Sequence, residues 1–232
     1  MKVTKQGNTC VWYDESLLKE SPLDVFEPTF WQEQNKVIGQ AKGRGITWFV
    51  QTATVPAALR HYRRGGLFGK LVSDHYLFTG WETSRPYKEM QVLSHLIHAD
   101  VNVPRPIAAR VVKRNFCYQA DLLSEKIADA TDLFTLLTTS QVDDRVLKRV
   151  GQEIRKMHNA NVNHTDLNIH NILIDKNDKV WIIDFDKCCV DSSSTYEEEN
   201  ISRLWRSFEK EKKKIIEFNR LSFIPLLKGY KE

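Results

Sequence analysis

The residues best suited to chemistry are an Asp–Asn pair and a second Asp in the C-terminal half. Asp166 precedes Asn171 by five residues in a polar stretch, and Asp184 follows the second of two short apolar runs. One carboxylate can orient an attacking hydroxyl group and accept its proton. A second carboxylate and an amide oxygen can bind the hard cations that bridge phosphates. Phosphoryl transfer needs this set of groups, so we expect Asp166 to be catalytic and Asn171 and Asp184 to bind metal.

The surrounding pattern brings these groups together. Apolar runs at 172–174 and 180–183 are joined by the polar sequence 175–179, which is typical of a β-hairpin. A hairpin returns the chain to the same edge, so the loop with Asp166 should lie beside Asp184. Asp and Asn are also common turn residues, and the hairpin in register behind them is what favours the functional interpretation.

The elements on either side predict an α+β protein of two lobes. Before residue 122 the chain has short β-like runs, interrupted by one helical segment that begins at Thr83 or Ser84 and reaches Ile97. After it, Ser140-x-x-Asp143 indicates a capping box opening a helix, and a last helix is expected at about 200–218. We therefore predict a β-rich lobe over 1–122 and a helical lobe over 123–232. The expected strands are 37–40, 46–52, 57–62, 107–112 and 117–123.

Composition restricts the choice of partners. The chain has 232 residues, 41% of them hydrophobic, and a formal net charge of +4. This mild basicity suits nucleotides, phosphorylated lipids or an anionic membrane face. No exposed pattern of aromatic residues interleaved with Arg and Lys is recognisable, so we expect no nucleic-acid partner. The four cysteines lack framework spacing and are expected to be reduced thiols.

The chain has no obvious segment for crossing a membrane. Its first residues lack an apolar run, and no stretch approaches the roughly 18 apolar residues of a spanning helix. We expect a cytoplasmic protein whose membrane contact, if any, is peripheral. The basic run 210–214 could lie on anionic lipid. Phe26, Phe30 and Trp31 could form core or an interfacial anchor, and the sequence does not decide between them.

The stretch 164–171 and the pair Asp184-Phe185 resemble the catalytic loop and metal loop of the protein-kinase-like superfamily. The resemblance implies ATP and Mg²⁺ as cofactors and assigns upstream counterparts. Gly43 and Gly45 resemble a shortened glycine-rich loop. Arg60 stands where the family has a strand Lys, and Glu89 where it has the helical Glu that pairs with that base.

Several positions depart from the superfamily pattern. Arg60 has a planar guanidinium group, suited to bidentate contact with phosphate, in place of the ammonium group of Lys. Asp186 replaces the glycine of the metal loop and adds a third acidic group there. No A-P-E sequence follows, and only 46 residues remain after Asp186, so the helical lobe should be abbreviated. Asn168 replaces the Lys of protein kinases, which favours a small molecule or glycan as the acceptor.

Within the superfamily the chain resembles the lipopolysaccharide kinase family. The resemblance is carried by segments 59–67, 103–106, 164–173, 183–187 and 203–207. It implies transfer of phosphate from ATP to the 4-hydroxyl of 3-deoxy-D-manno-octulosonic acid (Kdo) attached to lipid A, at the cytoplasmic face of the inner membrane of Gram-negative bacteria. Arg63, Arg64 and Asp186 are weaker candidates for substrate contacts. No obligate protein partner is evident.

Two alternatives stay open from the residues. The first is another small-molecule kinase of the same fold, of the aminoglycoside or choline type, which would share Asp166, Asn171 and Asp184. The second is a catalytically silent nucleotide-binding scaffold. A panel of acceptors separates the first from a lipopolysaccharide kinase, and turnover of ATP would exclude the second.

Overall fold

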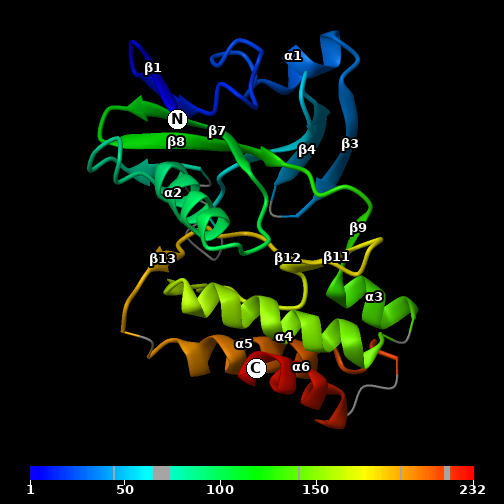
Figure 1. Ribbon diagram of the computed structural model, residues 1–232. Helices are drawn as coiled ribbons and strands as arrows, with labels where there is room; N and C mark the ends of the chain where they lie inside the picture. Colours follow the sequence, from blue (N-terminus) through cyan, green and yellow to red (C-terminus); the bar gives the residue numbers. More distant parts are fainter. Residues whose placement is uncertain (44, 65–73, 141, 194, 217–219) are drawn as a thin grey trace. The chain divides into compact units, whose positions relative to one another are not determined.

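The computed structural model describes residues 1–43, 45–64, 74–140, 142–193, 195–216 and 220–232. Arg44, in the expected glycine turn, and Gly65–Leu67, in the basic segment, lie outside the described residues. The chain forms two compact units (Figure 1). The first contains Met1–Gln91 and Arg105–Lys126, and the second contains Val92–Pro104 and Ile127–Glu232.

The first unit is built on an antiparallel sheet whose strand order is β1-β2-β7-β8-β5-β4-β3, with β6 paired to β8. All five expected strands are present in it. Three further strands were not expected: β1 and β2 extend one edge, and the short β6 pairs with β8. The strands are β1 (Lys2–Gln6), β2 (Thr9–Tyr13), β3 (Val37–Lys42), β4 (Ile46–Gln51), β5 (Pro56–His61), β6 (Tyr76–Leu77), β7 (Pro106–Arg114) and β8 (Cys117–Glu125).

Each face of this sheet carries its own apolar core. On one face, Leu59 and Leu123 pack with the segment that includes Phe26, Trp31 and the short helix α1 (Pro28–Glu33). On the other face, Leu122 and its neighbours pack with Met90 of helix α2 (Arg85–His98). Phe26 and Trp31 are almost fully buried. Phe26 and Trp31 therefore belong to the core and do not form an interfacial anchor.

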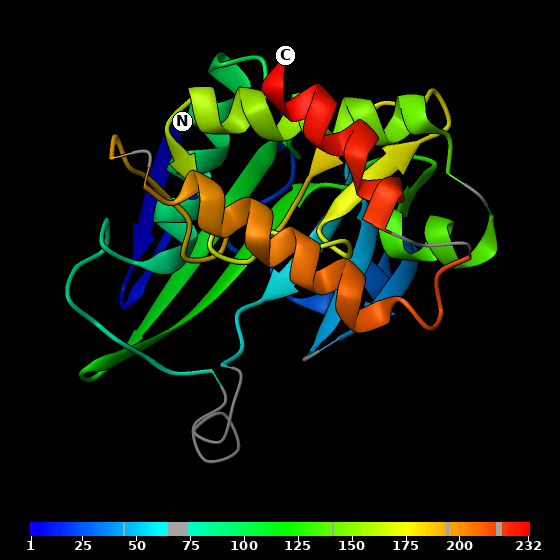
Figure 2. The same ribbon diagram turned by 90° about the horizontal axis from the view of Figure 1, so that it is seen from below.

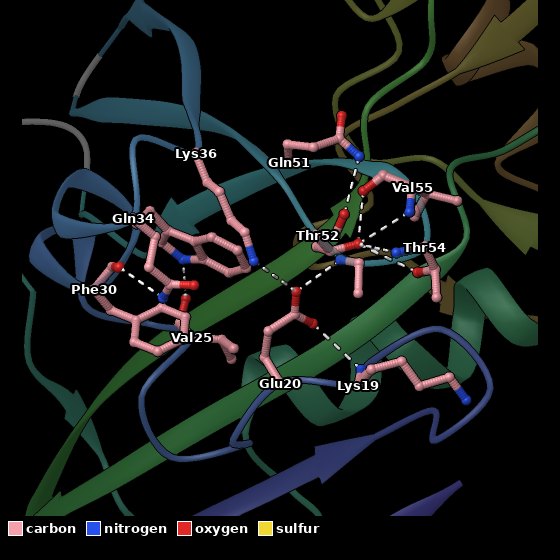
Figure 3. Close-up of polar contacts among 12 residues, drawn as sticks. Lys19, Glu20, Val25, Phe30, Gln34, Lys36, Gln51, Thr52, Thr54 and Val55 are labelled. Carbon is pink, nitrogen blue, oxygen red and sulfur yellow. Dashed lines mark hydrogen bonds and ion pairs between the residues drawn. The ribbon is translucent and has the colours of Figure 1, made fainter.

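Polar contacts fix the N-terminal segment to the turn between β4 and β5 (Figure 3). The Glu20 carboxylate accepts a hydrogen bond from the backbone N–H of Ala53 at 2.7 Å and lies 3.9 Å from the Lys36 ammonium group. Within the turn, Thr52 Oγ1 donates to the carbonyl of Val55 at 2.7 Å. These contacts fix the start of β5, the strand that carries Arg60.

The second unit combines helices with two small sets of strands. Its helices pack around a core that includes Leu133, Ile154, Leu204 and Phe208. The strands pair antiparallel as β12-β11-β9 and as β10-β13. The elements are β9 (Ala130–Asp132), α3 (Leu133–Thr139), α4 (Asp144–Asn159), β10 (Val162–Asn163), β11 (Ile172–Asp175), β12 (Val180–Ile182), β13 (Cys189–Val190), α5 (Glu197–Glu211), the 3₁₀ turn η2 (Arg220–Phe223) and α6 (Ile224–Lys231).

Two helix boundaries differ from the sequence-based expectation. Asp143 is the N-cap of α4, because its carboxylate accepts the backbone N–H of Arg145, whereas Ser140 is the C-cap of α3. The predicted capping box was therefore wrong. The last helix, expected at 200–218, begins at Glu197 and ends at Glu211, and α6 is a separate helix after it. Three Glu residues in the first turn of α5 favour the earlier start through the helix dipole.

Helices α4 and α6 approach each other closely at two glycines. A Cβ atom at Gly151 would lie 2.0 Å from the carbonyl oxygen of Leu226, and one at Gly229 would lie 2.0 Å from that of Lys148. No side chain fits at either position. The two backbones are therefore in direct contact, and the register of α6 along α4 is set by this glycine pair.

Candidate active site

The loops that carry Asp166 and Asp184 are held together at both ends within the second unit. The loop 164–171 connects β10 to β11, and the loop 183–188 connects β12 to β13. Strand β10 pairs with β13, and β11 pairs with β12. The backbone N–H of Ile183 also donates to the carbonyl of Asn171 at 3.0 Å. The hairpin predicted from the apolar runs is present, and it brings the two loops side by side.

His164 joins the two loops through its imidazole. The ring is fully buried, and burial lowers its pKa, so it is neutral. Its Nε2 lies 3.0 Å from the carbonyl oxygen of Ile183 and must carry the proton. Its Nδ1 then accepts the backbone N–H of Asp166 at 3.3 Å. The ring also packs against Phe185, with centroids 4.8 Å apart, so His164 fixes the backbone of Asp166 relative to the metal loop.

The amide side chains of the loop further define the position of Asp166. Asn168 Nδ2 and Asn171 Nδ2 both donate to the Asp166 carbonyl, at 2.8 and 3.0 Å. The carboxylate of Asp166 is exposed, and no donor among the described residues binds it. Because Nδ2 of Asn171 is bonded to the backbone, its Oδ1 is the atom that can bind a cation. The loop thus presents one carboxylate and one amide oxygen.

The metal loop places two acidic residues next to this amide. Asp184 is half-buried and has the positive φ angle of 64°, which turns the backbone sharply between β12 and Phe185. Asp186 is also half-buried. The contacts of the His164 ring with the Ile183 carbonyl and the Asp166 N–H place the loop of Asp184 and the loop of Asp166 beside the same ring. Oxygen donors from Asn171, Asp184 and Asp186 are the ligand type that Mg²⁺ prefers, so the donor set fits this metal.

Asn200 on α5 supports the catalytic loop from behind, and sequence analysis missed it. Its Oδ1 accepts the backbone N–H of His164 at 3.0 Å, and its Nδ2 donates to Asn163 Oδ1 at 3.0 Å. The side chain is buried and also lies 3.3 Å from His158 Nε2. Nothing in the local sequence marks Asn200, since its partners are more than thirty residues away.

In the first unit, Arg60 and Glu89 form the predicted ion pair, and this contact is confirmed. Arg60 Nη2 lies 2.6 Å from Glu89 Oε1. The Tyr62 hydroxyl donates to the other oxygen, Glu89 Oε2, and the guanidinium group lies 5.0 Å from the centre of the Tyr62 ring. Glu89 is 3% exposed and Arg60 29% exposed. The carboxylate therefore holds Arg60 in a fixed orientation, with part of its side chain exposed to solvent.

The other basic candidates occupy different positions. Gly43 and Gly45 form the turn between β3 and β4, with the N–H of Gly43 donating to the carbonyl of Gly45 at 2.8 Å. The Arg63 side chain lies against Gly45, where an added Cβ would be 2.8 Å from its Cδ. Arg64 donates from Nε to the carbonyl of His75. Arg63, more than Arg60, is thus the arginine beside the glycine turn.

Fold and site together define a protein-kinase-like phosphotransferase, and comparisons with known proteins identify the family. The model of the lipopolysaccharide kinase (Kdo/WaaP) family matches residues 28–230. The chain belongs to this family, as the sequence motifs indicated. The α+β, kinase-like fold expected from the sequence is also confirmed. A solved structure described as WaaP in complex with acyl carrier protein has a TM-score of 0.60, with 15% identity over 93% of this chain and 87% of that one.

Curated relatives cover nearly the whole chain. A 3-deoxy-D-manno-octulosonic acid kinase of Vibrio cholerae is 60% identical over 201 residues, covering 87% of this chain and 86% of the relative. Proteins of the same name from Photobacterium profundum and Haemophilus influenzae are 52% and 43% identical. They cover 96% and 99% of this chain, and 95% and 99% of their own lengths.

Proposed function

We propose that this protein transfers the γ-phosphate of ATP to the 4-hydroxyl of Kdo attached to lipid A, as a step in assembling the lipopolysaccharide core. The pairing of the two loops in the second unit carries the proposal, because it sets an exposed carboxylate beside a cluster of oxygen ligands. The names of relatives at 43–60% identity support the acceptor.

In this mechanism Asp166 acts on the acceptor. Its carboxylate orients the sugar hydroxyl and accepts the proton as the oxygen attacks phosphorus. The bonds from His164, Asn168 and Asn171 fix the Asp166 backbone, so its side chain needs little reorganisation before transfer. Asn171 and Asp184, with Asp186 beside them, would hold Mg²⁺, which neutralises charge on the phosphates when it is bound.

We assign contact with the nucleotide to the N-terminal β-rich lobe, 1–122, and the catalytic and metal loops to the lobe 123–232. Arg60, oriented by Glu89, would contact the phosphates of ATP, and the backbone of the turn at Gly43 and Gly45 would approach them. Arg63 and Arg64 remain candidates for the anionic acceptor. Arg63 is the better placed of the two to act near the glycine turn.

The acceptor is lipid-linked, so we place the reaction at the cytoplasmic face of the inner membrane. No helix within the described residues has the length and apolar character to cross a bilayer. The basic run after α5 is one candidate for peripheral contact. Its charge is partly compensated, because Lys212 pairs with Glu209 at 2.9 Å and Lys214 with Glu211 at 2.7 Å.

The proposal is tested by transfer of radiolabel from γ-labelled ATP to a panel of acceptors. The panel contains the Kdo–lipid A precursor, free Kdo, an aminoglycoside and a generic protein. We expect labelling of the precursor with Mg²⁺ present, and none with the Asp166→Asn variant. Labelling of the aminoglycoside alone would move the assignment to a small-molecule kinase. ATP binding without turnover on any acceptor would favour a silent scaffold.

A further inference from the structure

One end of the first unit exposes large apolar side chains at a hairpin tip. The turn between β7 and β8 is formed by Asn115, with a φ angle of 53°, and Phe116. Phe116 is 85% exposed, which makes it the most exposed large apolar side chain among the described residues. Leu77, on the neighbouring strand β6, is 67% exposed. A single exposed apolar side chain is common on protein surfaces, so Phe116 gains significance only from the residues around it.

Phe116 and Leu77 lie next to each other. Leu77 is the cross-strand partner of Cys117, and the backbone N–H of Phe78 donates to the carbonyl of Phe116 at 2.8 Å. In Figure 2 the green β7–β8 hairpin projects at its tip from the first unit. The two apolar residues therefore lie at the same end of the sheet, one residue apart across the β6–β8 ladder, and both belong to a small exposed protrusion at the hairpin tip.

Aromatic rings and cations stand directly behind this protrusion. The rings of Phe78 and Trp81 are 4.9 Å apart, and both are half-buried. The Lys113 ammonium lies 4.8 Å from the centre of the Phe78 ring, and that of Lys5 lies 5.8 Å from the Trp81 ring. Long basic side chains that cover aromatic rings while keeping their charge in water are typical of a membrane interface.

The cations of this region have no ion-pair partner within the described part of the chain. Among the residues that the structure describes, no carboxylate lies within 4.0 Å of the cationic groups of Lys5, Lys113 or Arg114. Glu82, which directly follows Trp81, is an exposed acidic residue in the same segment of the chain. This differs from the run after α5, where Lys212 and Lys214 are paired. Three available cations around an apolar tip match the charge of an anionic bilayer.

We propose that this hairpin-tip surface docks the protein on an anionic lipid bilayer. The surface consists of Lys5, Leu77, Phe78, Trp81, Lys113, Arg114 and Phe116. Phe116 and Leu77 enter the interfacial layer, and the cations contact lipid phosphates. The inference rests on the proposed function in one respect, since a lipid-linked acceptor gives the protein a reason to bind membrane. The surface itself is defined by exposure and charge alone.

The test is co-sedimentation with vesicles of phosphatidylglycerol and phosphatidylcholine, without nucleotide or acceptor. The double change Phe116→Ser and Leu77→Ser should lower the partition coefficient about tenfold. Lys113→Gln and Arg114→Gln should each lower it about fivefold at low salt, with the difference lost at high salt. Ile38→Ser, which removes a half-exposed apolar side chain on β3, and Lys228→Gln on α6 are the matched controls and should change nothing.

A further variant separates a bilayer from a protein partner. Phe116→Trp should bind vesicles at least as well as the wild type, because tryptophan favours the bilayer interface. Unchanged binding in the double Ser variant, or absence of vesicle binding by the wild type, overturns the proposal and leaves the surface to an acidic protein partner. Loss of binding in Phe116→Trp equal to that in Phe116→Ser overturns it as well.

Activity measurements distinguish failure of this surface from failure of the proposed function. Phe116→Ser should phosphorylate the detergent-dispersed precursor at the wild-type rate and the vesicle-embedded precursor more slowly. If the wild type labels neither form while vesicle binding still depends on Phe116, the docking surface stands and the proposed acceptor is wrong. Equal rates of wild type and Phe116→Ser on embedded precursor would overturn a role of the surface in catalysis at the membrane.

Discussion

Asp166 and Arg60 are held in place by different kinds of interaction. The backbone of Asp166 rests on uncharged groups, namely the neutral imidazole of His164 and, behind it, the amide of Asn200. Arg60 is held by the buried carboxylate of Glu89. A second charged cluster lies close by along the sheet, where Asp121 accepts from His61 and Arg110. One unit thus positions its candidate groups with neutral hydrogen bonds and the other with buried charges.

The difference bears on how each site responds to its surroundings. Neutral hydrogen bonds keep their geometry across pH and salt, and they fail when a donor or acceptor loses its partner. A buried carboxylate depends on its cation, and removing one member leaves a charge without compensation. We therefore expect the support of Asp166 to be insensitive to pH and salt. The region around Arg60 should respond to both.

The largest effect is expected from the two carboxylates of the second unit. Asp166→Ala should lower turnover about 10²- to 10⁴-fold, with affinity for ATP nearly unchanged, because the carboxylate acts on the acceptor. Asp184→Asn should weaken Mg²⁺-dependent nucleotide binding as well. Steady-state kinetics and nucleotide titration with and without Mg²⁺ measure both. Loss of ATP binding in a folded Asp166→Ala variant would contradict the assignment, and unchanged binding in Asp184→Asn would transfer the metal role to Asp186.

Disruption of the Arg60–Glu89 ion pair in the first unit should give the next largest effect. Glu89→Ala leaves the Arg60 guanidinium and the Tyr62 hydroxyl without their shared acceptor. We expect a loss of about 2 kcal/mol in stability, reduced from a fully buried pair because Arg60 is 29% exposed. Affinity for ATP should fall in the same variant, and Arg60→Ala should cost more activity than Arg63→Ala. Thermal unfolding and nucleotide titration would check this, and equal activity of the two Arg variants would favour Arg63 as the phosphate contact.

Substitution of Asn200 tests the uncharged hydrogen bonds that support the catalytic loop. Asn200→Ala removes the acceptor of the His164 N–H and the donor to Asn163, at a cost of about 1 to 2 kcal/mol. We expect kcat to fall, with little change in KM for ATP. The factor by which kcat falls should be the same at low and high salt. Asn177→Ala, in an exposed turn, is the matched control. A salt-dependent loss in Asn200→Ala would show that the support beneath Asp166 is not purely neutral.

The smallest effect is the pH dependence of the His61 cluster. The hydrogen bond to the Asp121 carboxylate raises the pKa of His61 above its ordinary value of 6.5, with Asp74 contributing. A raised pKa in the folded state means that protonated His61 stabilises the fold fully below about pH 6.5. This contribution is lost as the pH rises through the higher, folded-state pKa. The difference in thermal stability between wild type and His61→Gln should therefore shrink from pH 6 to pH 9.

The control for this effect is His98→Gln, an exposed histidine on α2 that pairs with no carboxylate among the described residues. This variant should leave the thermal stability close to that of the wild type. Arg110 also donates to Asp121, through Nε at 2.8 Å, so this carboxylate keeps a cationic partner in both variants. A constant difference between wild type and His61→Gln over the whole pH range would show that the histidine acts through packing alone.

The sequence predicted the parts of the site that depend on local pattern. The loop of Asp166 and the hairpin behind it follow from residue types and periodicity, whereas the pairing of Arg60 with Glu89 was implied by the resemblance to the protein-kinase-like superfamily. Strand β1 was missed because it is a polar edge strand, with all but one of its residues exposed. The boundary between α5 and α6 was missed because charged residues continue the helical pattern past Glu211.

Contacts between distant residues could not be predicted in this way. Asn200 meets His164 across thirty-six residues, and Arg63 meets Gly45 through the register of neighbouring strands. Neither contact has a local signature, because each depends on how whole elements pack. The choice of Asp143 over Ser140 as a cap likewise depends on where α3 ends. Tertiary structure decides these positions, and a single sequence does not reveal them.

The glycine contact between α4 and α6 has a consequence for insertions and deletions. Tyr230, one residue after Gly229, bonds to His158 Nδ1 at 2.7 Å, and His158 in turn meets Asn200. Each residue added to a helix rotates the part C-terminal to it by about 100°. A single-residue insertion between Ile224 and Gly229 would therefore either force a side chain into the backbone contact or turn Tyr230 away from His158. Lineages that tolerate substitutions over most of α6 should still keep its length up to Gly229 unchanged.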